Sequence, residues 1–205
     1  MHTKGARTKA QIVAAAAPLF NERGFAGTSM NDILDATGLE KGGVYLHFAS
    51  KDEIAIAAFD HAVKLLETRR LGALETHATA LGRLYACVDL FRASIKSPVL
   101  RGGCPLLNTA IDADDTHAAL RERARAAMQR WQTLLADLID EARADGALVA
   151  NVDAAALASI ITAALEGAIL TSRLLRDAQQ LHRVVDHLHG VLRSFETRPR
   201  AMAAR

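Results

Sequence analysis

TSMNDILDATGLEKGGVYLHFASK, from Thr28 to Lys51, is the stretch that decides how this 205-residue chain folds. Ser29 and Asp32 have the spacing of a capping box, and apolar residues follow at helical spacing, so a short helix begins here. Gly38 ends that helix, because glycine enters the left-handed helical region without steric cost. A second short helix starts a few residues later. Two short helices joined by a glycine turn are typical of a helix-turn-helix.

The second of these helices has a buried side and a bare side. Val44 and Phe48 point back toward the core, with Leu39 ahead of them. The bare side suits a DNA major groove, because small residues let the backbone approach the duplex and polar or basic groups reach base edges and phosphates. Leu46 could contact only a thymine methyl group or make no DNA contact. The predicted DNA contacts are Lys41, Gly42, Gly43, Tyr45, His47 and Lys51. The alternative is a pair of surface helices with an ordinary solvated face.

The run IVAAAAPLFNERGFAGTSMNDILDATGLEKGGVYLHFASKDE, from Ile12 to Glu53, resembles the DNA-binding domain of the TetR family of bacterial transcriptional regulators. The resemblance implies an all-α homodimer, generally a repressor, that leaves its operator when a small molecule binds the larger C-terminal domain. It also implies that Thr28 and Ser29 lie at a DNA phosphate. The expected partners are therefore double-stranded operator DNA, a second copy of the chain and an effector of unknown identity.

Two residues depart from the family pattern. Many members have an aromatic residue where this chain has Leu46, which puts a DNA contact at that position in doubt. Pro18 lies inside the first helix, where it removes the hydrogen bond to the Ala14 carbonyl. That loss costs roughly 3 kcal/mol unless the helix kinks.

The composition agrees with a helical DNA-binding protein. Half of the residues are hydrophobic and only 4% are aromatic, and this alanine- and leucine-rich composition favours helices. The formal net charge is +2, and residues 1–51 carry six basic against four acidic side chains. Such a weak basic excess makes binding depend on dimerisation and groove fit more than on bulk charge.

We expect a cytoplasmic protein with no membrane contact. The N-terminus leads into an amphipathic helix and does not resemble a signal peptide, and no apolar run reaches the length that spans a bilayer. The two cysteines do not make a disulfide framework or a metal motif.

Helical periodicity continues through the rest of the chain. The expected helices are a first one ended by Gly24, a long one opened by Ser50 and Glu53, one from about His77 to Lys96, a short one to about Ala113, a long one up to Gly146, and two more after Asp153 and around 181–195. These features predict an all-α fold of about nine helices. We place a three-helix DNA-binding domain at residues 1–50 and a larger ligand-binding and dimerisation domain at residues 51–205.

The helix after Asp153 is apolar on several faces, so several faces must be covered. One face would serve the chain's own core, and the other a partner's copy of the last two helices, in a two-fold four-helix bundle. Gly167 would permit close approach at the crossing. Such a dimer presents two recognition helices about 34 Å apart, which matches successive major grooves. The alternative is a monomer with a thicker core.

The effector would bind between helices of the C-terminal domain, in an apolar cavity with a few polar groups that orient it. The predicted lining residues are Leu84, Tyr85, Val88, Phe91, Cys104, Met128 and Trp131. For any one of these side chains, simple core packing is the alternative.

Cys104 precedes Pro105, and proline favours the first position of a helix, so this thiol would be the N-cap of the short helix. A helix N-terminus stabilises thiolate and raises its reactivity toward oxidants and electrophiles. The run GGCPLLN also looks like the equivalent loop of an oxidant- and electrophile-sensing subgroup of the TetR family. The alternative is a small buried cysteine that only packs. We assign Cys87 to the core.

A metal site or an enzyme finds little support in the sequence. His182, His187 and His189 do not share one helix face, so zinc would need ligands from elsewhere. No nucleophile, base and orienting carboxylate are grouped, and no phosphate-binding glycine loop is present. We therefore expect no catalytic residues, no metal and no cofactor. The alternative to a regulator is a small-molecule carrier or an enzyme with an incidental helix-turn-helix.

Overall fold

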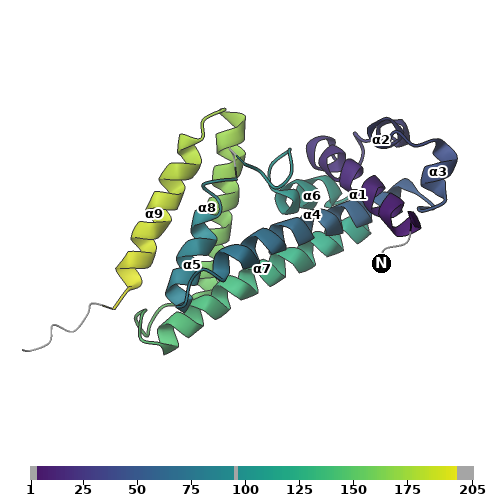
Figure 1. Cartoon of the computed structure of the whole chain (residues 1–205). Helices are drawn as coiled ribbons and strands as arrows, with labels where there is room; N and C mark the ends of the chain where they lie inside the picture. The colour runs from purple at the N-terminus through teal and green to yellow at the C-terminus, as the bar shows by residue number, and fades with distance from the viewer. Residues whose placement is uncertain (1–3, 95–96, 198–205) are drawn as a thin grey trace, which may run out of the picture. The chain divides into compact units, whose positions relative to one another are not determined.

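The computed structural model describes residues 4–94 and 97–197, and this part of the chain is all-α (Figure 1). Its helices are α1 (Lys4–Arg23), α2 (Met30–Thr37), α3 (Lys41–Tyr45), α4 (Lys51–Leu74), α5 (Ala80–Asp89), α6 (Pro105–Ala113), α7 (Ala118–Ala144), α8 (Ala154–Leu174) and α9 (Gln179–Phe195). Nine helices in the described residues confirm the predicted fold class.

The chain forms two compact units. The first unit comprises Met1–Arg69 with Ser94–Gln129, and the second comprises Arg70–Ala93 with Arg130–Arg205. Helices α4 and α7 contribute residues to both units. The predicted functional domains, 1–50 and 51–205, do not follow this division of packing, and they stay a prediction.

The helix-turn-helix forms through local interactions that the sequence predicts. The Ser29 hydroxyl accepts the Asp32 N–H, and the Asp32 carboxylate accepts the Ser29 N–H, which completes the capping box of α2. Gly38 ends α2 at φ 66°, in the left-handed region, and its N–H bonds to the Leu34 carbonyl. The chain then turns into α3, which is only five residues long.

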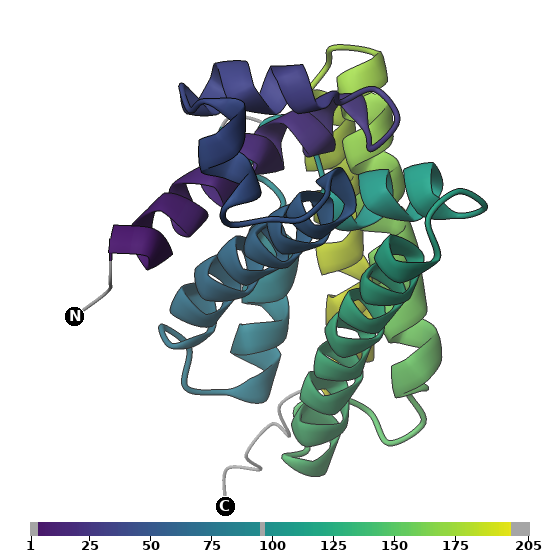
Figure 2. The ribbon, with the colours of Figure 1, turned by 90° about the vertical axis from the view of Figure 1, so that its right-hand side faces the viewer.

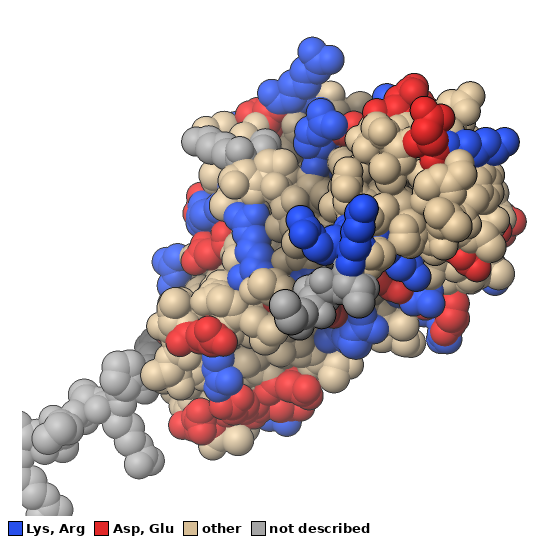
Figure 3. Space-filling model, turned by 45° about the vertical axis from the view of Figure 1, so that its right-hand side comes forward, with Lys and Arg blue, Asp and Glu red and all other residues tan. Residues whose placement is uncertain are grey.

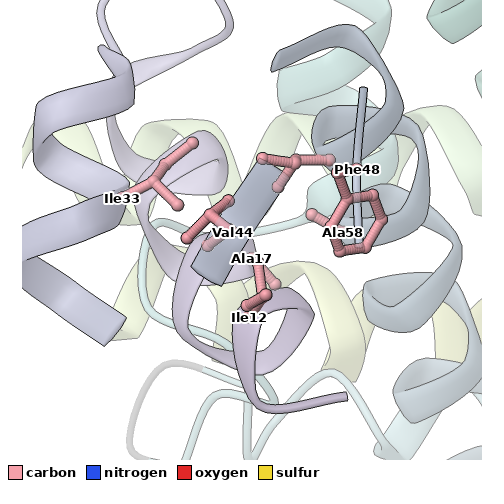
Figure 4. Packing of buried hydrophobic residues seen from close by; sticks show 8 residues of the cluster. Ile12, Ala17, Ile33, Val44, Phe48 and Ala58 are labelled. Carbon is pink, nitrogen blue, oxygen red and sulfur yellow. The ribbon is translucent and has the colours of Figure 1, made fainter. Parts of the chain in front are cut away.

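One hydrophobic cluster holds α1, α2, α3 and the start of α4 together. In Figure 4, side chains from these helices converge on a common centre, and most of them are completely buried. The cluster consists of Ile12, Ala16, Ala17, Ile33, Val44, Phe48, Ile54 and Ala58. Helices α1 and α2 pack against each other, as both ribbon views show (Figures 1 and 2). The predicted inward positions Val44 and Phe48 are therefore confirmed.

The helix predicted from His77 to Lys96 is shorter in the structure. Its start moves to Ala80, because the Thr79 hydroxyl caps it by accepting the Gly82 N–H. Its end moves to Asp89, where the backbone tightens into three-residue turns with hydrogen bonds such as that from the Phe91 N–H to the Val88 carbonyl. Residues 95 and 96 lie outside the described part of the chain.

In the second unit, α8 and α9 lie side by side (Figure 1), and α8 begins at the predicted cap, where Asp153 accepts the Ala156 N–H. An 18-residue window of the 21-residue α8 has a mean hydropathy of 1.7, so by length and composition this helix could cross a membrane. The prediction that no apolar stretch reaches that length was therefore wrong. Few charges interrupt α8, and one of them, Glu166, is buried. Half of the apolar window is buried within the protein.

Replacing glycine by alanine should change the free energy of unfolding in opposite directions at two positions. Gly38→Ala should lower the free energy of unfolding by about 1 kcal/mol or more, because alanine is strained at positive φ. Gly72→Ala, in the last turn of α4 with open space around it, should raise it by up to about 0.5 kcal/mol, because alanine favours the helical conformation more than glycine does. Urea denaturation of both variants measures the effect. Equal stability of the two variants would contradict the turn geometry at residue 38.

Candidate DNA-binding surface and effector domain

The outer face of α3 is bare. Lys41 and Gly42 are exposed, Tyr45 is 43% exposed, and Leu46 directly after the helix is 84% exposed. The Lys41 ammonium lies 5.8 Å from the centre of the Tyr45 ring, so the two side chains stand together one turn apart. An exposed lysine and tyrosine on a short helix, with no side chain at the position after the lysine, make a surface that fits a DNA groove.

The other predicted contacts flank this face. Gly43 and His47 are half-buried, and Ser29 is exposed at the start of α2. The hydrogen bond from the Ser29 hydroxyl lowers the pKa of Asp32, with further contributions from the Ser29 N–H and Arg23. Because this pKa is depressed, the capping interaction is present at neutral pH and is lost as the pH falls through it.

Thr28 does not fit the predicted phosphate contact. Its side chain is completely buried, and its hydroxyl donates to the Gly24 carbonyl at 2.8 Å, with the Leu19 carbonyl at 3.3 Å. A buried hydroxyl that already donates within the protein has no free hydrogen for a phosphate. Thr28 instead fixes the turn that leads from α1 into α2.

Lys51 also serves the fold. Its ammonium donates to the carbonyls of Phe25 at 2.9 Å and Thr28 at 3.1 Å, and it lies 4.0 Å from the centre of the Phe25 ring. The lysine at the start of α4 thus holds the turn before α2. Two of its three donors are used in this way, which makes a brace the better interpretation than the predicted phosphate contact.

Sequence reasoning missed a polar network at the end of α1. The buried Asn21 amide donates to the carbonyls of Arg101 at 2.6 Å and Gly103 at 3.2 Å, while Asn108 donates to the Asn21 side-chain oxygen at 3.0 Å. Nearby, the Asp112 carboxylate accepts the Phe25 N–H at 2.7 Å. Nothing in the sequence predicts a hydrogen bond between two asparagines that lie far apart in the chain.

Gly102 lets the loop come close enough for this network. It has φ 106°, and a methyl group there would lie 2.6 Å from the Asn21 carbonyl oxygen. Beside the network, the first unit contains a cavity of about 30 Å³, lined by Asn21, Phe59 and Asn108 among others. It has room for a water molecule or two and is too small for an organic effector. None of the seven predicted effector residues lines it.

The predicted effector residues fall into two groups. Cys104 and Met128 pack against the apolar cluster of the first unit that includes Phe59, Leu106 and Leu120. The other five belong to the second unit, and they are Leu84, Tyr85, Val88, Phe91 and Trp131. The prediction that all seven line one cavity stays a prediction.

Three of the second-unit residues already contact other side chains of the chain. The Tyr85 hydroxyl donates to the Glu196 carboxylate at 2.6 Å, and its ring meets the His189 ring edge-on. Burial and the Glu196 carboxylate raise the pKa of Tyr85, so the phenol stays protonated and donates at neutral pH. The rings of Phe91 and Trp131 lie 6.0 Å apart, centre to centre.

The two cysteines lie in different surroundings. Cys104 is half-buried and is the N-cap residue of α6, as predicted, with Pro105 at the first helical position. Cys87 is completely buried, which confirms its assignment to the core, and burial raises its pKa to about 11. Of the two thiols, Cys104 is the more accessible to a reagent.

Charges on the surface are mixed. Basic side chains on the face shown in Figure 3 are interspersed with acidic and uncharged ones, in keeping with the formal net charge of +2. Contacts that depend on the shape of α3 must therefore supply much of any DNA affinity.

Two family profiles match this chain. One, described as "Bacterial regulatory proteins, tetR family", covers residues 12–58, and the other, described as "Tetracyclin repressor-like, C-terminal domain", covers residues 80–188. The chain belongs to the TetR family of bacterial transcriptional regulators. The first profile contains the helix-turn-helix, and the second contains α5 to α8 and part of α9.

Relatives of similar length support this membership. An HTH-type transcriptional regulator of Mycobacterium tuberculosis, itself uncharacterised, is 31% identical over 89% of this chain and 92% of its own length. A TetR transcriptional regulator from Chloroflexus aurantiacus, solved by crystallography, has a TM-score of 0.91 and 42% identity over 94% of this chain and 98% of its own. A cysteine mutant of the TetR-family regulator CifR, complexed with operator DNA, has a TM-score of 0.79 over 91% of this chain and 95% of its own. At 21% identity, CifR shows only a shared fold.

Family membership establishes the class of function. This TetR-family chain is a ligand-responsive, DNA-binding transcriptional regulator, as the sequence predicted, and the alternative of a carrier or enzyme is not favoured. Members of the family act as dimers and bind small-molecule effectors.

The brace at Lys51 has a measurable signature. Lys51→Met should lower the free energy of unfolding by about 1–2 kcal/mol, because two carbonyls lose a charged donor. Operator affinity should fall with it, but the slope of log affinity against log salt should stay nearly the same, since loss of a phosphate contact changes that slope by about 1. Lys64→Met, at an exposed position of the same helix, is the control. Unchanged stability with a reduced slope would make Lys51 a phosphate contact after all.

Proposed function

We propose that the protein binds its operator through the outer face of α3, presented twice by a homodimer, and leaves it when an effector binds. The observation that carries this proposal is the combination of a fully buried Val44 with an exposed Lys41 and Tyr45 on the same five-residue helix. The helix is thus anchored from behind and bare in front. No catalytic role is assigned to any residue, and the proposed compartment is the cytoplasm.

Within this surface the residues have different tasks. Lys41 and Tyr45 reach base edges or phosphates, Gly42 and Gly43 allow close approach of the backbone, and the flanking Ser29 and His47 contact phosphates without reading sequence. Thr28 and Lys51 hold this surface in place from within.

The proposed dimer interface is the outer face of α8 together with α9. Ile160 is 57% exposed, and Leu170 and Leu174 continue the apolar stripe at helical spacing. Gly167 lies on the same face, and nothing within 4 Å limits the residue there. Glycine in mid-helix is unfavourable relative to alanine, so close packing of a second copy explains its presence better than this chain's own core. The same packing would cover the apolar face that made α8 resemble a membrane span.

Two further points remain proposals. We place the DNA-binding function in residues 1–50 and effector binding and dimerisation in residues 51–205. Cys104 stays a candidate sensor of electrophiles or oxidants, supported by its half-exposed position at the N-terminus of α6.

Substitutions on the bare face test the operator proposal. Lys41→Ala and Tyr45→Ala should each weaken binding to the DNA upstream of the protein's own gene by roughly 10-fold or more. Lys41→Ala should also reduce the salt slope by about 1 if the lysine contacts a phosphate. Fluorescence anisotropy at several salt concentrations measures both quantities. Lys64→Ala, with its lysine on α4, should leave both unchanged. Wild-type affinity in both α3 variants would remove α3 as the reading element.

A matched pair of isoleucines tests the dimer interface. Ile160→Asp on α8 should produce monomers and weaken operator binding, because a charge would be buried between the two copies. Ile111→Asp on α6, where the isoleucine is 67% exposed, should remain dimeric. Light scattering after size-exclusion chromatography gives the mass of each variant. A dimeric Ile160→Asp protein would move the interface away from this face.

A further inference from the structure

Arg70, in the last turns of α4, carries a guanidinium group with an unused donor. Its Nε atom is buried, and among the described residues it has no hydrogen-bond partner. The contact that the structure does give this side chain is aromatic, since the guanidinium carbon lies 5.4 Å from the centre of the Trp131 ring. A buried donor without an acceptor is unusual in a native protein and calls for a group that completes it.

Buried apolar side chains lie beside Arg70. Trp131 is buried, and its ring also faces that of Phe91. The fully buried Cys87 is close enough that the positive charge of Arg70 works against the burial that raises the thiol pKa. All four residues belong to the second unit, so their arrangement does not depend on the first.

The geometry of a guanidinium group limits what can complete it. Stacking on an aromatic ring uses only the flat face, while the five N–H donors point outward in the plane of the group. Two of them match the two oxygens of a carboxylate in parallel hydrogen bonds. One carboxylate also balances the single positive charge. A dianionic phosphate would leave one negative charge uncompensated against tryptophan and phenylalanine, which is costly.

We propose that the effector of this regulator is an organic carboxylate, whose anionic group pairs with the in-plane edge of Arg70 and whose apolar body packs by Trp131 and Phe91. The proposal rests on the proposed function in that it takes the protein to be controlled by a ligand of its C-terminal domain. It adds the chemical class of that ligand and the residue that selects it.

Trp131 makes the proposal directly measurable. It is the single tryptophan of the chain, so the intrinsic fluorescence of the full-length protein reports on this site. The probes are matched pairs of carboxylate and neutral amide, namely phenylacetate with phenylacetamide and octanoate with octanamide. At least one carboxylate should change the Trp131 emission saturably and bind at least about tenfold more tightly than its amide, as expected for a charge-assisted hydrogen bond.

Variants at two neighbouring arginines provide the control. Arg70→Met, which keeps an unbranched apolar side chain, should lose at least about tenfold in carboxylate affinity and keep the weak affinity for the amide. Arg70→Lys keeps the charge but not the planar donors, so it should bind with intermediate affinity. Arg69→Met should bind like the wild type, because Arg69 donates to the Ser97 carbonyl instead. Thermal melting of each variant shows that it is folded.

Three results would overturn the assignment. They are equal binding of acid and amide, unchanged carboxylate affinity in folded Arg70→Met, and the absence of a fluorescence response to both carboxylates. Operator binding without ligand is measured separately by anisotropy. Failure of ligand-free protein to bind operator would refute the proposed function and leave the Arg70 result standing. Normal operator binding with no carboxylate preference would refute only the effector class.

Discussion

The proposed DNA-binding face of α3 depends on the burial of Val44. A helix of five residues cannot persist alone in water, since forming its first turn costs more than its few hydrogen bonds return. Val44 and Phe48 anchor α3 and the residues after it in the cluster formed by α1, α2 and α4. Burial of each such side chain contributes roughly 1.5–3 kcal/mol. The same burial sets the rotation of α3, and so decides that Lys41 and Tyr45 face outward.

A structural feature could be predicted from the sequence only where the interaction that produces it is short in range. The capping box of Ser29 and the left-handed Gly38 act within four residues, so their consequences could be predicted from the local sequence. The roles of Thr28 and Lys51 could not, because both depend on carbonyls presented by a turn that only the folded chain forms. A lysine after a recognition helix looks the same in sequence whether it faces a phosphate or a backbone carbonyl.

The effector region was harder to predict for a related reason. Helical periodicity identified Trp131 as an inward-facing residue, and the structure agrees. Periodicity did not identify Arg70 as a ligand-binding candidate, because arginine in a helix is normally solvated. The sequence also does not show that the Arg70 guanidinium lies against the Trp131 ring. A polar side chain in an apolar setting becomes visible only when partners from distant segments are known. Ligand chemistry is therefore the part of this protein least accessible to sequence reasoning.

Two features connect the helix-turn-helix with the segments behind it. The Asn21, Asn108 and Asp112 hydrogen bonds tie the end of α1 to α6 and the loop before it. Because the Asn21 side chain is buried, a shift of the loop before α6 that left its amide donors unpaired would cost about 1–3 kcal/mol for each one, so the end of α1 is favoured to move with that loop. The second feature is α4 itself, one continuous helix that carries Lys51 in its first turn and Arg70 near its end. The segment from the end of α1 to the start of α2, residues 21–28, is thus held by side chains of both α4 and α6. Under the proposed function, an effector would release DNA by binding more tightly to a conformation in which that segment is displaced.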